Sequence, residues 1–424
     1  MSHTAYRAKH LRKRGIQAVL RDPTSARLLG AQTISEIGDF VGLAALLLLA
    51  YHKSGSLVAT AGIFAARSLP SLLVGTVFSG WLDVPPRRTA LVWLTLAGAA
   101  VTTAVVVFPT TAAALVAAAL LGAIRTAASS VTGGAAVDGL DDEVRASYFA
   151  LSSSVNQASQ VIGFVAGATV TLLISARAAL GFDVVTYLFA VVVLWTLPAI
   201  ASRPRRRRPP PFHGVKIIAS TPILALVTPV VWATVFATAV PETFAASLSH
   251  GSQLPVLMAA FPLGTSVMAG FLARREFLDR VLNQLMLALL FAVGFAGGAV
   301  VLGVGVSRWL LVPANFVAGL GSTWTVGART TFALNTPPEH MAQVEAAAIS
   351  SNVLLEGLGV LALAAIGQQV GPVGSYAFAA ALVSLAVAVA LGVVRARFRV
   401  ESSVQRSHRR TPKKREAPEV ELAD

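Results

Sequence analysis

Long apolar runs with few charges constrain this chain more than any other feature. Runs of roughly 20 apolar residues recur along it, and about 20 helical residues cross the ~30 Å hydrocarbon core of a bilayer. Only 13% of the residues are charged and the mean hydropathy is +0.70, whereas soluble domains carry about 25% charged residues. A water-soluble core cannot hide so much apolar surface. The sequence therefore predicts an all-α, polytopic membrane protein.

The apolar segments predict twelve transmembrane helices in two halves. We expect these helices over 28–51, 57–81, 88–108, 111–137, 147–174, 179–201, 222–248, 252–273, 282–303, 308–330, 342–368 and 373–397. A basic, proline-rich and extended linker separates the first six from the last six. The predicted parts are a basic cytoplasmic N-terminal segment (1–27), a first six-helix bundle (28–201), the cytoplasmic linker (202–221), a second bundle (222–398) and a charged, disordered cytoplasmic tail (399–424).

The positions of lysine and arginine predict the orientation, because cytoplasmic loops carry an excess of both. An even number of helices puts both termini on one side. Of the 34 basic residues, 29 fall on that side and three, Lys53, Arg177 and Arg308, on the other; Arg67 and Arg125 lie inside helices. We therefore expect a multi-pass protein of the cell membrane, the inner or plasma membrane of a bacterium, with both termini in the cytoplasm.

Short sequence matches between the halves indicate an internal duplication. The segment 150–155 reads ALSSSV and 348–353 reads AISSNV, in corresponding helices. The segment 80–82 reads GWL and 270–272 reads GFL, each shortly before a pair of arginines. Such parallel repeats are typical of transporters built from two six-helix halves.

Several classes of site are excluded. The chain has no cysteine, so it forms no disulfide, thiolate metal site or iron–sulfur cluster. Its seven histidines fall in predicted tails, loops or helix ends, and no phosphate-binding Gly-x-x-x-x-Gly-Lys-Ser/Thr loop occurs. We expect no enzyme, no catalytic residue, no metal and no cofactor. The membrane topology accounts for the positions of the basic residues, so no nucleic-acid partner is expected. The expected partners are the bilayer, a small-molecule substrate and protons. The chain is expected to be a monomer.

The loop after the second predicted helix resembles a known signature. Residues 79–88 read SGWLDVPPRR, which resembles the Gly-x-Leu-x-Asp-Arg-x-Gly/Pro-Arg-Arg signature of the major facilitator superfamily. Ser79 and Val84 stand where a glycine and an arginine are usual. Further segments are similar to the twelve-helix drug and siderophore exporters of that superfamily: 31–39 (AQTISEIGD), 69–70 (LP) and 183–187 (DVVTY). The resemblance implies two pseudo-repeated six-helix halves and transport by alternating access.

Asp83, Arg87 and Arg88 in this loop are gating candidates. Arginines at a cytoplasmic helix end can pair with Asp83 and with the carbonyl end of the preceding helix. Such a cluster can hold one transport state and release in another. The alternative is that both arginines only follow the positive-inside rule.

Charged residues inside the first six helices are proton-coupling candidates, because each costs about 2.5–3.5 kcal/mol on insertion scales. The first helix carries Gln32, Glu36 and Asp39 on one face. Depth along the helices matches Asp39 with Arg67 and Glu36 with Arg125, and the swapped pairing remains open because the carboxylates share a face. The functional hypothesis is a carboxylate whose proton exchanges against cargo. The alternative is a permanent buried ion pair that only orients helices.

The second six helices carry fewer charges. Glu356 lies near the middle of the helix 342–368, and no lysine or arginine lies mid-helix in this half. We interpret Glu356 as a proton-coupling candidate, with a site for cationic cargo and a bond to a neighbouring helix as alternatives. Glu242 follows Pro241 in the outer third of its helix and is a candidate for an outer gate.

Polar and aromatic residues on helix faces are substrate-binding candidates. Asn156 and Gln160 share a stripe of the fifth helix, where they can contact cargo or bond across helices. Gln32, Trp324 and Asn352 complete the set. For Trp324, packing in the core is an equal alternative to a place in a cavity wall.

These observations predict a secondary transporter that exports a small amphipathic molecule, such as a drug, antibiotic or siderophore-like compound, in exchange for protons. Within the same class, the alternative is an importer or uniporter of a small metabolite with static ion pairs. Outside that class, the alternative is a receptor or scaffold in the membrane that does not transport.

Overall fold

The computed structural model describes residues 17–74, 86–200, 213–238, 240–248, 251–272, 281–337 and 341–410. Over these residues the chain is helical apart from short connections. The first half consists of α2 (Pro23–Ser54), α3 (Leu57–Leu73), α4 (Arg87–Val107), α5 (Thr111–Gly139), α6 (Asp142–Leu173) and α7 (Ala176–Trp195). The second half consists of α8 (His213–Ser220), α9 (Pro222–Ala237), α10 (Val240–Leu248), α11 (Gln253–Leu272), α12 (Val281–Val304), η3 (Arg308–Leu310), α13 (Leu311–Ser322), α14 (Trp324–Leu334) and α15 (Met341–Arg410).

The described helices correspond in order to the twelve predicted segments, with α8 as an addition. Several begin where a side chain caps the first turn, which explains the shifts in their starts. Asp22 accepts from the Ser25 amide at 2.7 Å just before α2, five residues ahead of the predicted start at 28. Ser175 accepts from the Ala178 amide at 3.1 Å just before α7, which starts three residues ahead of the predicted 179.

Proline and glycine account for two breaks that change the predicted helix boundaries. The seventh predicted helix consists of α9 and α10, because Pro241 has no N–H to continue the ladder and its ring clashes with the carbonyl four residues back. The eleventh and twelfth helices are the two arms of α15, divided at Gly371, where φ is 80°. Only glycine adopts that backbone conformation readily, and Pro372 starts the second arm.

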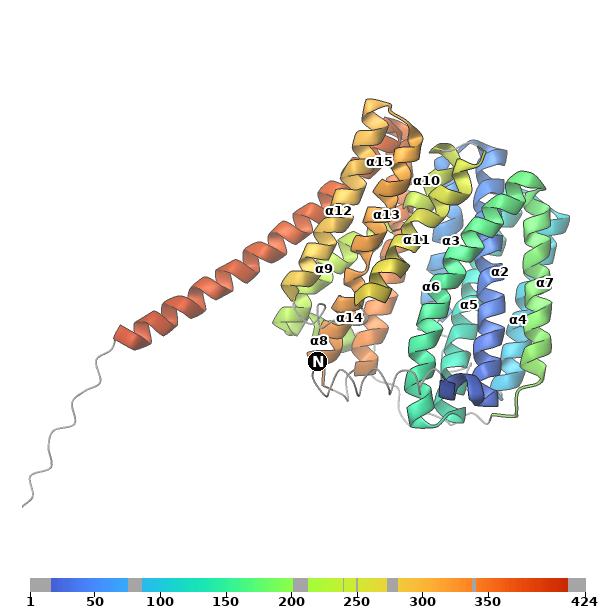
Figure 1. Ribbon diagram of the computed structural model, residues 1–424, viewed down its shortest axis with the longest axis horizontal. Coiled ribbons are helices and arrows are strands. Elements are labelled where there is room, and N and C mark those ends of the chain that lie inside the picture. The colour runs from blue at the N-terminus through green and yellow to red at the C-terminus, as the bar shows by residue number, and fades with distance from the viewer. Residues whose placement is uncertain are drawn as a thin grey trace, which may run out of the picture.

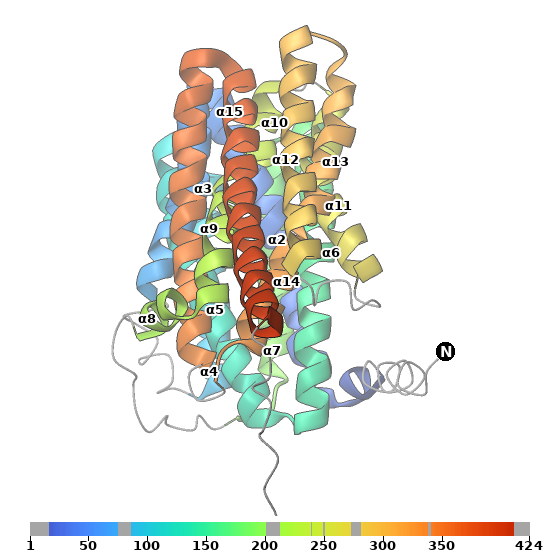
Figure 2. The same cartoon turned by 90° about the vertical axis from the view of Figure 1, so that its left-hand side faces the viewer.

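Two predicted irregular segments are partly helical. The linker contains α8, which packs against α9 and α15 at one end of the bundle (Figure 2); the proline run 209–211 lies outside the described residues. The tail predicted from 399 begins within α15, which continues to Arg410. Residues 411–424 lie outside the described part of the chain.

Many of these helices are able to cross a bilayer. Among the described residues, eight stretches are long and apolar enough to do so by length and composition. They are Pro23–Ser54, Arg87–Val107, Thr111–Gly139, Ala176–Trp195, Pro222–Leu248, Gln253–Leu272, Val281–Val304 and Ala347–Ala396, the last spanning both arms of α15. The chain is therefore an all-α membrane protein.

The two halves lie side by side, each as a bundle of its own (Figure 1). They meet where α3 packs on α15 and where α6 packs on α11. A repeated packing detail relates them: Gly98 of α4 leaves room for the ring of Tyr187 on α7, and Gly298 of α12 leaves room for the ring of Tyr376 on α15. A Cβ at either glycine would collide with the tyrosine. Equivalent helices thus pack in the same way in both halves.

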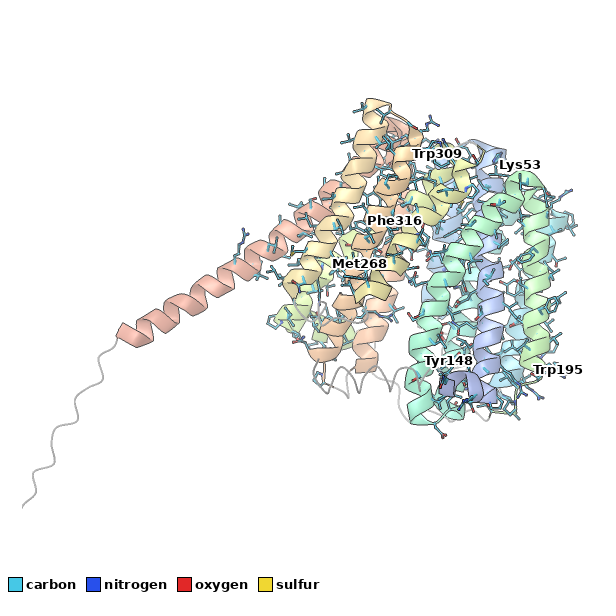
Figure 3. The ribbon with its side chains drawn as sticks, in the orientation of Figure 1. Lys53, Tyr148, Trp195, Met268, Trp309 and Phe316 are labelled. Atoms are coloured by element: carbon cyan, nitrogen blue, oxygen red, sulfur yellow. The ribbon has the colours of Figure 1, made fainter. Side chains whose placement is uncertain are left out.

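The bundle has two ends that differ in how the halves meet. Lys53 and Trp309 mark one end, and Tyr148 and Trp195 mark the other (Figure 3); we refer to them as the Lys53 end and the Trp195 end. At the Lys53 end α10 packs on α2 and α3 of the other half, and Ser56 donates a hydrogen bond to Gln368 at 3.4 Å. Toward the Trp195 end the ribbons of the halves separate (Figure 1).

Candidate functional site

A cavity of about 710 Å³ lies between the two halves and receives side chains from both. Its walls from the first half are Phe40, Leu43, Phe64, Arg67, Ser68, Gly122, Arg125, Thr126, Ser129, Ser130, Asn156, Gln160 and Phe164. Its walls from the second half are Thr238, Glu242, Phe261, Ile349, Ser350, Val353 and Glu356. We call it the central cavity. Its volume lies within the ~300–1,000 Å³ of small-molecule sites.

A second cavity of about 350 Å³ lies inside the first half, among α2, α4, α5, α6 and α7. We call it the side chamber. It is lined by Gln32, Glu36 and Asp39 of α2 and reaches Leu194 and Tyr148 near the Trp195 end. Apart from three residues, the rest of the lining consists of Leu28, Ala31, Ser35, Leu91, Leu94, Thr95, Ile124, Ala128, Thr132, Gly133, Phe149, Ser152, Ser153, Tyr187 and Ala190. Those three, Arg125, Ser129 and Asn156, line both cavities.

An ion pair stands where the two cavities meet. The Nη1 of Arg125 lies 3.4 Å from Oδ2 of Asp39, and the Tyr187 hydroxyl donates to Oδ1 of the same carboxylate. The pairing of Glu36 with Arg125 that depth matching favoured is therefore corrected, since Arg125 bonds Asp39 instead. Depth along the helices could not decide between the two carboxylates, because they lie only one helical turn apart on the same face of α2.

Arg67 lies beside this pair rather than replacing it. Its guanidinium carbon is 5.9 Å from the ring centre of Phe40, and that of Arg125 is 5.0 Å away, so both cations contact one aromatic ring. The lining of a small separate cavity includes Arg67, Asp39 and Asp183. The members of the predicted Asp39–Arg67 pair thus lie in one cluster, in which Asp39 forms an ion pair with Arg125.

Asp183 of α7 is a buried acidic residue that the sequence interpretation did not select as a site residue. It is 1% exposed, it accepts from the Thr102 hydroxyl at 3.3 Å, and its Oδ1 lacks a hydrogen-bond partner among the described residues. Gly38 and Gly42 of α2 make room for it, because a Cβ at either would collide with its carboxylate. The predicted helix start at 179 put Asp183 near a helix end; the Ser175 cap signal would have placed it two turns inside.

Glu36 belongs to a hydrogen-bonded group in the side chamber. The side-chain amide nitrogen of Gln32 donates to Oε1 of Glu36 at 2.9 Å. The side-chain oxygen of Gln32 accepts from the hydroxyls of Ser152 at 2.8 Å and Tyr148 at 3.4 Å. The Oε2 of Glu36 is buried and has no hydrogen-bond partner in the described part of the chain. Asn156 lines the same chamber. Gln32 therefore joins α2 to α6 and holds one oxygen of Glu36.

The second half presents two carboxylates to the central cavity. Glu242 of α10 is 3% exposed, and its buried Oε2 lacks a hydrogen-bond partner among the described residues. Glu356 of α15 is partly buried. The sequence predicted no cation near Glu356 within its own half, and the fold places it close enough to Arg67 and Arg125 of the first half to be attracted by both.

The substrate-binding candidates separate into those that line a cavity and those that do not. Gln160 lines the central cavity, and Asn352 lines neither cavity although its neighbours Ser350 and Val353 do. Trp324 is 0% exposed and donates its indole N–H to the Thr234 hydroxyl at 3.0 Å. Of the two alternatives for Trp324, packing in the core is the one that this burial and hydrogen bond favour.

The gating candidates are only partly described. Asp83 lies outside the described residues. Arg87 is buried and pairs with Asp138 at the end of α5, at 3.1 Å, and Arg88 donates to the Leu197 carbonyl at 3.2 Å. Both arginines therefore join the start of α4 to other segments of the first half at the Trp195 end.

The arrangement of two helical halves around a polar, partly charged central cavity defines a class of membrane transporters. The sequence profile of the Major Facilitator Superfamily matches residues 28–354. The chain belongs to this superfamily and is a transporter, not an enzyme.

Solved structures of low sequence identity share the fold. A variant of the peptide transporter POT has a TM-score of 0.70 and 12% identity, over 87% of this chain and 93% of its own. The nucleoside transporter NupG has a TM-score of 0.69 and 9% identity, over 87% of this chain and 98% of its own. The human organic anion transporter MFSD10 (TETRAN) has a TM-score of 0.59 and 16% identity, over 86% and 99%. No curated protein matches the sequence.

Proposed function

We propose that the chain exports a small amphipathic molecule, of drug, antibiotic or siderophore type, in exchange for protons. The observation that carries this proposal is the Asp39–Arg125 pair at the junction of the central cavity and the side chamber. A carboxylate that loses its arginine partner is costly inside a membrane unless it binds a proton. Movement of the Arg125 guanidinium away from Asp39 can therefore be coupled to proton binding by Asp39.

Glu36 takes the second role in this cycle. Glu36 lines the side chamber one helical turn from Asp39, and its buried Oε2 lacks a hydrogen-bond partner among the described residues, so it can receive a proton that Asp39 releases. Arg125 lines both cavities. Cargo in the central cavity and a proton in the side chamber therefore favour different orientations of its side chain. A proton that moves down 100 mV supplies about 2.3 kcal/mol, which supports a roughly 50-fold gradient of neutral cargo.

We propose that the Trp195 end faces the cytoplasm of a bacterial cell. The positive-inside rule supports this orientation, because Arg87, Arg88 and Arg145 lie at that end. The contact of α10 with α2 and α3 then closes the outer side. In this orientation both termini and the linker are cytoplasmic, and Arg87, Arg88 and Asp83 belong to the inner gate. Glu242 belongs to the outer gate, and one copy of the chain is the transporting unit.

The test is cargo flux in liposomes under an imposed pH gradient. The purified chain is reconstituted with a pH-sensitive dye inside, and a panel of amphipathic compounds is added with and without the gradient. With an acidic lumen, we expect uptake of at least one compound and a rise of the lumenal pH as protons leave in exchange. Both should stop when an ionophore removes the gradient.

Import or uniport with static ion pairs is the rival within the class. In that case the flux of the transported compound is the same before and after the pH gradient is removed. That result would refute proton exchange and leave transport itself in place.

A further inference from the structure

We propose that Glu242 and Glu356 form a recognition site for a protonated amine, so that the cargo is an organic cation with an aromatic or apolar body. This inference rests on the proposed export function and names the class of its substrate. It concerns the wall of the central cavity that the second half contributes, opposite the Asp39–Arg125 pair.

The first observation is the geometry of Glu242. Its side chain is 3% exposed, it lines the central cavity, and its Oε2 has no hydrogen-bond partner in the described part of the chain. A buried polar group without a partner costs about 1–3 kcal/mol, and more when it is charged. An N–H donor of a ligand in the cavity would remove that cost.

The second observation is that a second carboxylate faces the same space from another helix. Glu356 of α15 lines the same cavity as Glu242. Arg67 and Arg125 of the first half attract Glu356. An ammonium group placed between the two carboxylates has three N–H donors and can bond both.

The third observation is the charge balance around the cavities. The lining of the central cavity contains two acidic side chains, Glu242 and Glu356 of the second half, and two arginines, Arg67 and Arg125 of the first half. Both charged residues that the second half contributes to the central cavity are acidic. The second half therefore offers a cation binding energy that it cannot offer an anion.

The fourth observation concerns the body of the ligand. The rings of Phe40, Phe64, Phe164 and Phe261 line the central cavity. Aromatic rings bind apolar groups by contact and attract cations through their faces. The cavity of about 710 Å³ is large enough for a molecule of drug size. The site thus combines the carboxyl groups of Glu242 and Glu356 with aromatic walls.

The test is equilibrium binding of three probes that share one ring system and differ in charge. The full chain in lipid nanodiscs, with no gradient, is titrated with 1-naphthylmethylamine, 1-naphthylmethanol and 1-naphthoate. We expect the amine to bind at least tenfold more tightly than the alcohol and the carboxylate to bind least. Equal affinity for the amine and the alcohol, or no binding of the amine, would overturn the proposal.

Variants assign the preference to the two carboxylates. Glu242→Gln and Glu356→Gln are expected to lower the amine-to-alcohol affinity ratio about tenfold each, and retained alcohol binding reports an intact cavity. Asp141→Asn, which removes an exposed carboxylate at the Trp195 end, is the matched control and keeps the ratio. An unchanged ratio in both glutamine variants would mean that these groups carry only protons, and the proposal would be wrong.

A conservative variant covers loss of folding. If Glu242→Gln abolishes binding of both probes, Glu242→Asp is measured, and the amine preference is expected to return; its failure to return refutes the site. Because binding is measured without a gradient, it does not depend on proton coupling. Loss of gradient-driven flux together with intact amine preference would refute the proposed exchange and leave this site standing.

Discussion

The Asp39–Arg125 ion pair predicts a measurable coupling energy between α2 and α5. At the observed 3.4 Å, Coulomb's law gives about 5 kcal/mol for an effective dielectric constant of ~20. The Arg125 side chain is 30% exposed and that of Asp39 11%, so water in the cavities screens part of this attraction. We therefore expect a coupling energy of about 2 kcal/mol, between the values of exposed and fully buried pairs.

A double-mutant cycle measures this quantity. Asp39→Asn, Arg125→Gln and the double variant are compared with the native chain by unfolding in mixed micelles, with the free energy of unfolding as the readout. Either single change is expected to destabilise the protein by about 2–3 kcal/mol, because it leaves one partly buried charge without its ionic partner. The double variant should be less destabilised than the sum of the single changes.

Additivity of the two single effects to within about 0.5 kcal/mol would refute the ion pair as an energetic link. A Glu36→Gln/Arg125→Gln cycle serves as the comparison, since Glu36 lies on the same helix face and bonds Gln32. A larger coupling in that second cycle would restore the pairing that depth along the helices favoured and would contradict the geometry described above.

Three further predictions concern function and packing. Glu36→Gln is expected to abolish gradient-driven flux in liposomes while the chain still inserts and folds, and native flux would remove Glu36 from the mechanism. Gly167→Ala puts a methyl group against the backbone of α2 and should lower the free energy of unfolding by about 1–3 kcal/mol, whereas Gly181→Ala, with open space around it, should not destabilise; equal effects would contradict the close α2–α6 packing. Trp324→Phe removes the hydrogen bond to Thr234 and should cost about 1 kcal/mol of stability with cargo binding unchanged, and a binding defect would return Trp324 to the cavity wall.

Much of the fold follows from local physical signals in the sequence. Apolar length defined the helices, and a capping side chain such as Asp22 or Ser175 is visible in the sequence before each start it sets. The break between α9 and α10 follows equally from Pro241. The helical continuation to Arg410 does not, since a charged and polar composition is compatible with either a helix or disorder.

The candidate site was predictable in its members and not in its pairings. A rare charge inside an apolar run stands out, which selected Glu36, Asp39, Arg67, Arg125 and Glu356. Which carboxylate an arginine bonds depends on helix rotation and on the approach of neighbouring helices, and one sequence does not encode these as a pattern.

Contacts between distant segments account for what the sequence interpretation missed. Asp183 is enclosed through Gly38 and Gly42 of another helix, and Trp324 is fixed by a hydroxyl on α9, 90 residues away. Neither relation has a periodicity that could be read from the chain.

The second arm of α15 has a practical consequence. It continues without a further break from Pro372 to Arg410, a length of about 58 Å at ~1.5 Å per residue, or nearly twice the thickness of a hydrocarbon core of about 30 Å. Its last part projects away from both bundles (Figure 1). A fluorescent protein or affinity tag attached after this helix would be held clear of both bundles, so the C-terminus is the favourable position for a reporter in every assay described above.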